Sequence, residues 1–158
     1  MTGSGSDQLK LEQFLPYRLS ILSNRVSHSI AVAYGEKFDL NIPAWRVMVI
    51  LQRYPGLVAA DLVEKTAMDK VAISRAVSYL LDKSYVTRDE HSHDKRRWLL
   101  RLTPEGCEVY RQIVPLALSY ERDLLEGFSE EEVEVLHTML DRLTDRATGW
   151  KEMPPPIV

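Results

Sequence analysis

The sequence lacks the features that would place it in a membrane or in an oxidising compartment. Its 158 residues contain no apolar run near the ~20 residues that cross a bilayer, and they do not open with a signal peptide. The single cysteine, Cys107, has no second cysteine with which to form an internal disulfide. These absences lead us to expect a soluble cytoplasmic protein that does not bind membranes.

Motifs for catalysis are also absent. The chain has no glycine-rich phosphate loop, no G-x-S-x-G turn and no cluster of metal ligands at a familiar spacing. His91 and His93 form an H-x-H pair without a further His or Cys nearby, which favours solvated or phosphate-facing side chains over a metal site. The sequence therefore predicts no enzyme, no catalytic residue, no metal and no cofactor.

What is present is an ordinary globular composition with an uneven distribution of charge. Hydrophobic residues make up 45% of the chain and charged residues 27%, which argues against extensive disorder. The net charge is −3, yet residues 65–101 carry nine Lys and Arg against five Asp and Glu. A basic middle between acidic flanks indicates a partner of negative charge for the middle, although chance produces modest asymmetries of this kind.

Hydrophobic periodicity predicts four helices, a β-hairpin and two further helices. The first helix runs from Leu9 and ends at Gly35, and the second starts at 41–43 and stops before Pro55. Short helices follow at 57–65 and 69–83, then strand-like segments at 85–88 and 98–102 around a polar loop. Helices starting at 103–105 and after the capping box at 129–132 complete the chain.

This order predicts a mainly α fold with a small β-hairpin, the layout of a winged helix-turn-helix. We expect the winged DNA-binding domain at 40–103 and a helical dimerisation region made of 9–36 and 104–148. Residues 1–8 and 149–158 are expected to be tails, since the first is rich in Gly and Ser and the second contains three consecutive prolines.

The helix at 69–83 has the pattern of a recognition helix. Its apolar residues fall on one face, and the opposite face carries small and polar side chains that allow close approach to base edges and phosphates. The predicted DNA contacts of this helix are Lys70, Ala72, Ser74, Arg75, Ser78 and Tyr79. The alternative is an ordinary amphipathic helix with a solvated polar face.

The hairpin favours DNA binding over that alternative. Its tip contains Lys95, Arg96 and Arg97, three consecutive cations that repel one another unless a polyanion neutralises them. A guanidinium from such a tip fits the narrow minor groove, where the potential is most negative. The sequence does not decide which arginine reaches DNA.

These segments together resemble the MarR (multiple antibiotic resistance regulator) family. The resemblance rests on Leu80 at the end of the recognition helix, on Val86 and Arg88, on Asp94-x-Arg96-Arg97, and on Leu102-Thr103-x-x-Gly106. One departure is Ser84, which stands where the family usually has a glycine in a left-handed turn. Serine adopts that conformation at some cost, so we expect a strained turn that is retained.

The resemblance implies a homodimeric transcriptional regulator, a repressor, that binds a pseudo-palindromic operator in double-stranded DNA. The apolar stripes of the first and last helices agree with this, because a second chain would bury them. Packing of those stripes within one chain is the alternative. Two other functions also stay open: a winged helix that binds another protein, and a DNA-binding protein that responds to no ligand.

The resemblance further implies control by a small aromatic carboxylate, phenol or thioester. Arg18 and Arg25 lie two helical turns apart beside an apolar stripe, where each guanidinium needs an anionic partner or water. His28 and Trp45 are the other candidate ligand contacts. An ion pair for the arginines and core packing for Trp45 are equally compatible with the sequence.

Overall fold

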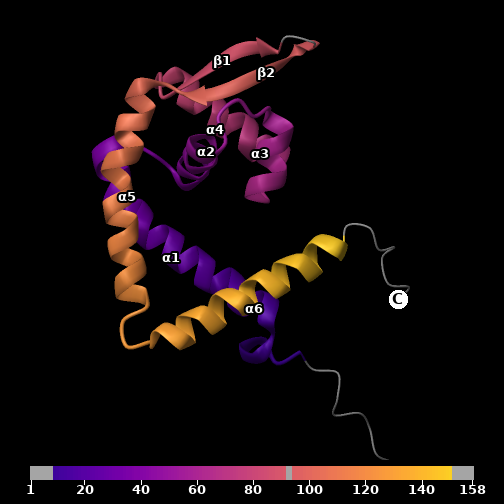
Figure 1. Cartoon of the computed structure of the whole chain (residues 1–158), viewed down its shortest axis with the longest axis vertical. Coiled ribbons are helices and arrows are strands. Elements are labelled where there is room, and N and C mark those ends of the chain that lie inside the picture. Colours follow the sequence, from indigo (N-terminus) through magenta and orange to yellow (C-terminus); the bar gives the residue numbers. More distant parts are fainter. Residues whose placement is uncertain (1–8, 92–93, 151–158) are drawn as a thin grey trace, which may run out of the picture. The chain divides into compact units, whose positions relative to one another are not determined.

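The computed structural model confirms the predicted order of elements (Figure 1). It describes residues 9–91 and 94–150, and of residues 91 and 94–96 it describes only the backbone. The two predicted tails, 1–8 and most of 149–158, lie outside the described residues. The elements are η1 (Leu11–Gln13), α1 (Leu15–Phe38), α2 (Ile42–Arg53), α3 (Ala59–Thr66), α4 (Lys70–Asp82), β1 (Val86–His91), β2 (Asp94–Leu102), α5 (Pro104–Leu124) and α6 (Glu130–Gly149).

Side-chain caps start four of the described helices, among them α5, where the Thr103 hydroxyl accepts from the Gly106 amide at 3.0 Å. The side chain of Asn41 accepts a hydrogen bond from the amide of Ala44 at 2.9 Å, and that of Asp69 accepts one from Ala72 at 2.8 Å. Ser129 forms the predicted capping box, because its amide donates to the Glu132 carboxylate at 2.8 Å and its hydroxyl accepts from the Glu132 amide at 3.2 Å. These oxygens satisfy first-turn amides that have no partner within the helix.

Three predicted boundaries are wrong. Helix α1 begins at Leu15 instead of Leu9, directly before Pro16, because proline is tolerated in the first turn of a helix and not in its interior. It continues past Gly35 to Phe38, and the left-handed backbone of Asp39 (φ 50°) closes the last turn through a bond from its amide to the Gly35 carbonyl at 2.9 Å. The hairpin is longer than predicted, because the antiparallel ladder continues through the polar residues as far as the pair His91↔Asp94. Backbone pairing does not require apolar side chains, so composition underestimated both strands.

The chain divides into two compact units, Met1–Ala117 and Leu118–Val158, with the boundary inside α5. The first unit contains α1–α4, the hairpin and the main core, in which Met48, Leu51, Leu62, Ile73 and Leu80 are buried. The second unit contains α6, which begins at the Ser129 capping box. None of the described helices is both long enough and apolar enough to cross a bilayer. The assignment of domains at 40–103 and at 9–36 with 104–148 stays a prediction.

A tight turn joins the recognition helix α4 to β1. Ser84 has φ 60°, the left-handed conformation that was predicted at this position. The amide of Tyr85 donates to the Leu80 carbonyl and that of Ser84 to the Leu81 carbonyl, both at 2.9 Å. These two bonds form a Schellman motif, which satisfies the last carbonyls of α4 and sets the direction in which the hairpin leaves the helix.

Candidate nucleic-acid interface

Helix α4 presents a compact polar face to solvent. Lys70, Ser74, Arg75 and Ser78 are exposed, whereas Ala72 is half-buried. The opposite face of α4 carries Ile73, Ala76 and Leu80, which are buried in the core. Packing of this apolar face fixes the rotation of the helix, so four of the six predicted contacts share one accessible surface.

Val71 belongs to the same exposed face and was missed by the sequence reasoning. It is 59% exposed and lies one helical turn before Arg75. An exposed aliphatic side chain beside polar ones suits contact with a thymine methyl group in the major groove. The signal was present in the sequence, since Val71 falls outside the apolar face of α4.

Tyr79 is engaged in contacts within the protein. Its hydroxyl donates to the backbone carbonyl of Asp39, and the Lys83 ammonium lies 5.3 Å from the centre of its ring. Lys83 also forms an ion pair with the Asp39 carboxylate at 2.9 Å. The role of Tyr79 in DNA contact therefore stays a prediction, and its observed partner is the end of α1.

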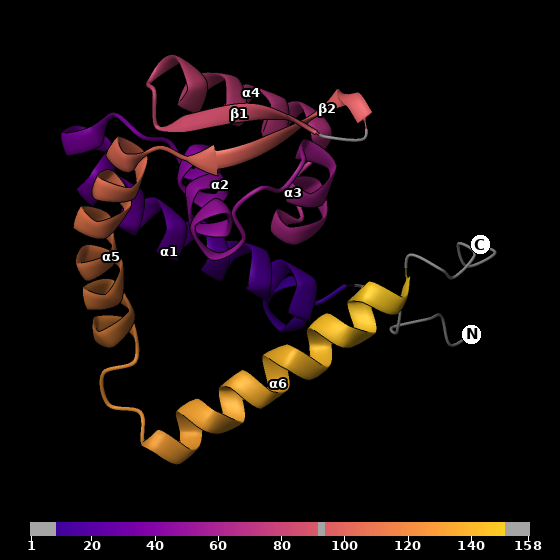
Figure 2. The same cartoon turned by 45° about the horizontal axis from the view of Figure 1, so that its top comes forward.

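The hairpin lies beside α4 and α3 (Figure 2). A hollow of about 370 Å³ runs between these elements, lined by Ser74 and Ser78 of α4, by Ala59 and Ala60 of α3, and by Arg88 of β1. Arg88 was not among the predicted contacts, because its position on the strand did not show which way its side chain faces. The hollow joins the polar face of α4 to a cation of the hairpin.

A second hollow, of about 290 Å³, lies closer to the hairpin and is lined by both Arg88 and Arg97. The Arg88 guanidinium lies 4.9 Å from the centre of the Trp98 ring, a cation–π contact that limits its motion. Arg97 is exposed, as predicted. The side chains of Lys95 and Arg96 lie outside what the structure describes.

The backbone of β2 is irregular where the predicted cations occur. Strand pairing steps from Glu90↔Trp98 to His91↔Asp94, so residues 95–97 fall between two successive pairs of the ladder. An irregularity of this kind in the pairing interrupts the regular alternation of side chains along a strand. The irregularity sets these three residues apart from the regular part of the hairpin.

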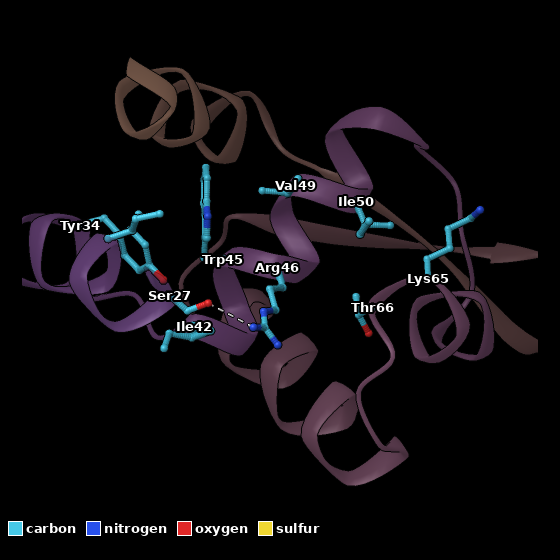
Figure 3. A pocket seen from close by; sticks show the side chains of 10 residues that line it. Ser27, Tyr34, Ile42, Trp45, Arg46, Val49, Ile50, Lys65 and Thr66 are labelled. Atoms are coloured by element: carbon cyan, nitrogen blue, oxygen red, sulfur yellow. Dashed lines mark hydrogen bonds between the residues drawn. The ribbon is translucent and has the colours of Figure 1, made fainter. Parts of the chain in front are cut away.

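A separate cavity of about 340 Å³ lies between α1 and α2 and reaches the end of α3 (Figure 3). Its walls include Tyr34, Trp45 and Arg46, and the Arg46 guanidinium donates to the Ser27 hydroxyl at 3.3 Å. Trp45 lies between two tyrosines: the centres of the Tyr34 and Tyr110 rings are each 5.6 Å from that of Trp45. The cavity thus combines an aromatic wall with a cation.

The predicted ligand residues do not meet at this cavity. Trp45 lines it, but Arg18 is exposed on α1, and Arg25 and His28 line a different hollow together with Asn24 and Ser29. The cation that accompanies Trp45 is its sequence neighbour Arg46. The spacing of residues along α1 did not reveal which cation lines the cavity, because that depends on which faces of α1 and α2 meet.

Tyr34 is the buried polar residue of the cavity wall. It is 1% exposed, and burial raises the pKa of its hydroxyl to about 12, with the nearby Arg46 charge acting in the opposite direction. The tyrosine is therefore neutral at physiological pH and keeps its hydroxyl proton. Figure 3 shows its ring on the same side of the cavity as Trp45 and Ser27.

Comparison with known proteins gives consistent results. The sequence profile of the MarR family matches residues 38–97. The HTH-type transcriptional repressor YetL of Bacillus subtilis (strain 168) is 28% identical over 153 residues, which cover 96% of this chain and 90% of YetL.

Solved structures are similar over most of the chain. A MarR/EmrR family transcriptional regulator from Acinetobacter sp. ADP1 has a TM-score of 0.81 and 28% identity, covering 89% of this chain and 99% of that one. A mutant MarR from Escherichia coli, solved in complex with operator DNA, has a TM-score of 0.73 and 21% identity, with coverage of 86% and 99%. At that identity the second structure shows a shared fold.

Proposed function

We propose that this chain is a DNA-binding transcriptional regulator of the MarR family, and that it is a repressor which binds a pseudo-palindromic operator as a homodimer. The observation that carries the proposal is the exposed face of α4 with Val71, Ser74 and Arg75, which lies beside a hairpin that carries Arg88 and Arg97. In this arrangement α4 enters the major groove and the hairpin reaches the adjacent minor groove or backbone.

The unpartnered apolar side chains of the helical ends support a dimer. In the first unit, Phe14, Leu15 and Leu22 are at least 40% exposed. In the second unit, Leu136, Met139 and Leu140 form an exposed stripe along α6. Exposed stripes of this kind are costly in water, and a second copy of the chain would bury them.

The dimer is tested by one matched pair of substitutions. Leu140→Glu places a charge in the stripe, and we expect it to shift the protein to a monomer in sedimentation analysis. Thr138→Glu places the same charge on the other side of α6 and should leave the dimer intact. A wild-type protein that is monomeric at micromolar concentration would contradict the dimer.

The cavity beside Trp45 supports control by a small aromatic anion. Its volume of about 340 Å³ suits a small aromatic molecule, Trp45 offers a ring to stack on, and Arg46 offers a charge for a carboxylate. Because α2 packs against α4, an occupant of this cavity would move the recognition helix relative to its partner in the dimer.

Selection of bound duplexes from a random pool tests the function directly, in the presence and absence of benzoate and salicylate. We expect enrichment of a two-fold symmetric site and weaker retention when the acid is present. Transcription from a promoter containing the selected site should fall when the protein is added. A wild-type protein that binds no duplex at low salt would favour the alternative, a winged helix that binds another protein.

A further inference from the structure

The C-terminal ends of α1 and α4 meet at a cluster of three side chains, Asp39, Tyr79 and Lys83, here called the Asp39 cluster. Asp39 follows the last residue of α1, and Lys83 follows the last residue of α4. Lys83 pairs with the Asp39 carboxylate at 2.9 Å, and the Tyr79 hydroxyl donates to the Asp39 carbonyl. The cluster therefore connects the end of α1 to the recognition helix by two independent bonds.

The chemistry of the cluster favours this arrangement. A cation at a helix C-terminus interacts favourably with the helix dipole, and Lys83 lies at that end of α4 and beside that end of α1. A carboxylate there is unfavourable unless it is paired, and Lys83 provides the pairing. The bond from Lys83 and the contact with Tyr79 lower the pKa of Asp39, and the bond to Asp39 raises the pKa of Lys83.

The backbone of Asp39 has the geometry that the connection needs. Its left-handed conformation (φ 50°) is unusual for a residue other than glycine, and Asp tolerates it better than most. This conformation ends α1 and leaves the Asp39 carbonyl free to accept from Tyr79. The identity of residue 39 thus serves the turn, the ion pair and the contact with α4 at once.

Other contacts of α1 lead to the ligand cavity. Ser27 accepts from Arg46, and Tyr34 packs against Trp45 at 5.6 Å between ring centres. An occupant of the cavity would therefore act on α1 at several points. The Asp39 cluster lies at the end of the same helix and contacts α4 directly.

We propose that the Asp39 cluster is a positioning contact that passes the position of α1 to the recognition helix, so that it sets the affinity for the operator. This inference rests on the proposed function, because its readout is DNA binding. Tyr79 and Lys83 then act on DNA affinity through the placement of α4, and Lys83 makes no phosphate contact of its own.

The test uses Asp39→Asn, Lys83→Met and Tyr79→Phe in the full-length protein, with affinity measured for the selected operator at several salt concentrations. Asparagine tolerates the left-handed backbone, methionine retains the lysine stem, and phenylalanine retains the ring. The matched control is Asp82→Asn, which removes an exposed carboxylate next to Lys83 and outside the cluster. Each variant is compared well below its unfolding temperature.

The sign of the effect separates positioning from simple electrostatics. Removing an acidic charge should strengthen binding to a polyanion, and we expect that, or no change, for Asp82→Asn. For Asp39→Asn we expect the affinity for the operator to fall about two- to fivefold, which corresponds to the free energy that an exposed ion pair contributes. Stronger or unchanged binding by Asp39→Asn would overturn the proposal.

Lys83→Met gives a second, independent measurement. Removing a lysine that neutralises a phosphate reduces the magnitude of the slope of log K against log salt by about one. The proposal predicts that Lys83→Met leaves the slope unchanged. It also predicts that the double variant Asp39→Asn with Lys83→Met loses no more operator affinity than either single variant does. A slope of smaller magnitude, or additive losses of affinity, would contradict it.

Amide hydrogen exchange distinguishes failure of this inference from failure of the proposed function. We expect faster exchange at residues 36–41 and 79–85 in Asp39→Asn and in Tyr79→Phe, with or without DNA. If the wild type binds no duplex but exchange changes as expected, the connection stands and the proposed function fails. If the wild type binds its operator and neither affinity nor exchange changes, the connection fails.

Discussion

A β-carbon at Gly106 would lie 2.1 Å from the carbonyl oxygen of Tyr85. The first turn of α5 therefore touches the backbone of the turn that joins α4 to β1. Thr103 strengthens the junction, because its hydroxyl donates to the Ser84 carbonyl at 2.7 Å and its amide donates to the Tyr85 carbonyl at 3.0 Å. The Leu-Thr-x-x-Gly motif thus joins α5 to the end of the recognition helix.

Gly106→Ala is expected to destabilise the fold. The new methyl group must displace backbone, which no side-chain rotation can relieve, so we expect a loss of at least about 2 kcal/mol in the free energy of unfolding. Urea denaturation measures it. Gly149→Ala in α6 is the control, since a β-carbon there has no atom within 4 Å. Equal stability of the two variants would show that α5 packs differently.

Ser84→Gly is expected to stabilise the protein. At φ 60° glycine removes the strain of the left-handed conformation, about 1–2 kcal/mol, but it loses more conformational entropy on folding, about 0.5–1 kcal/mol. The net gain in the free energy of unfolding is therefore under about 1.5 kcal/mol. Thermal unfolding measures the gain. Ser84→Val, which is β-branched, should destabilise the fold, and a stabilising Val would mean that the turn is not left-handed.

Arg75→Ala and Arg97→Ala are expected to differ in kind. Loss of Arg75, on the exposed face of α4, should reduce the preference for operator over random DNA about tenfold or more. Loss of Arg97, on the hairpin, should weaken binding to all sequences and lower the salt slope by about one. Competition between operator and random duplexes, at several salt concentrations, measures both effects. A preference that survives Arg75→Ala would contradict base contact by this residue.

Arg46→Met is expected to abolish the effect of aromatic acids while leaving DNA affinity intact. The substitution removes the cation that accompanies Trp45 in the cavity but keeps an apolar stem of similar length. Calorimetric titration with benzoate provides the measurement. Arg25→Met, which removes a cation of a different hollow, is the matched control. If Arg25→Met and not Arg46→Met abolishes binding, the cavity at Trp45 is not the effector site.

Tyr34 is expected to make stability fall at high pH. Burial raises its pKa to about 12 in the folded protein, against about 10 in an unfolded chain. Between these values the unfolded state loses the proton and the folded state keeps it, so stability declines as pH rises from about 10 to 12. Urea denaturation across this range, compared with Tyr34→Phe, isolates the effect. An equal decline in Tyr34→Phe would assign it to other groups.

Local interactions along the chain determined much of the fold. The capping box at 129–132 was predictable because a capping oxygen acts within three residues of its own position, and Asn41 and Asp69 cap their helices in the same local way. The turn at Ser84 was predictable from its place in a family-like motif, and the structure shows the positive φ that this place requires. The apolar face of α4 likewise showed which side of the helix meets the core.

The sequence alone thus determined the element order, the caps and the exposed face of α4, because each depends on neighbours within one or two turns. Tertiary structure alone decided the partners of side chains far apart in the chain. It placed Arg46 beside Trp45 and Arg25 elsewhere, and it joined Tyr79 to Asp39, forty positions away. Such pairings depend on how two helices rotate and cross, which is set by packing of the whole core and by no local pattern.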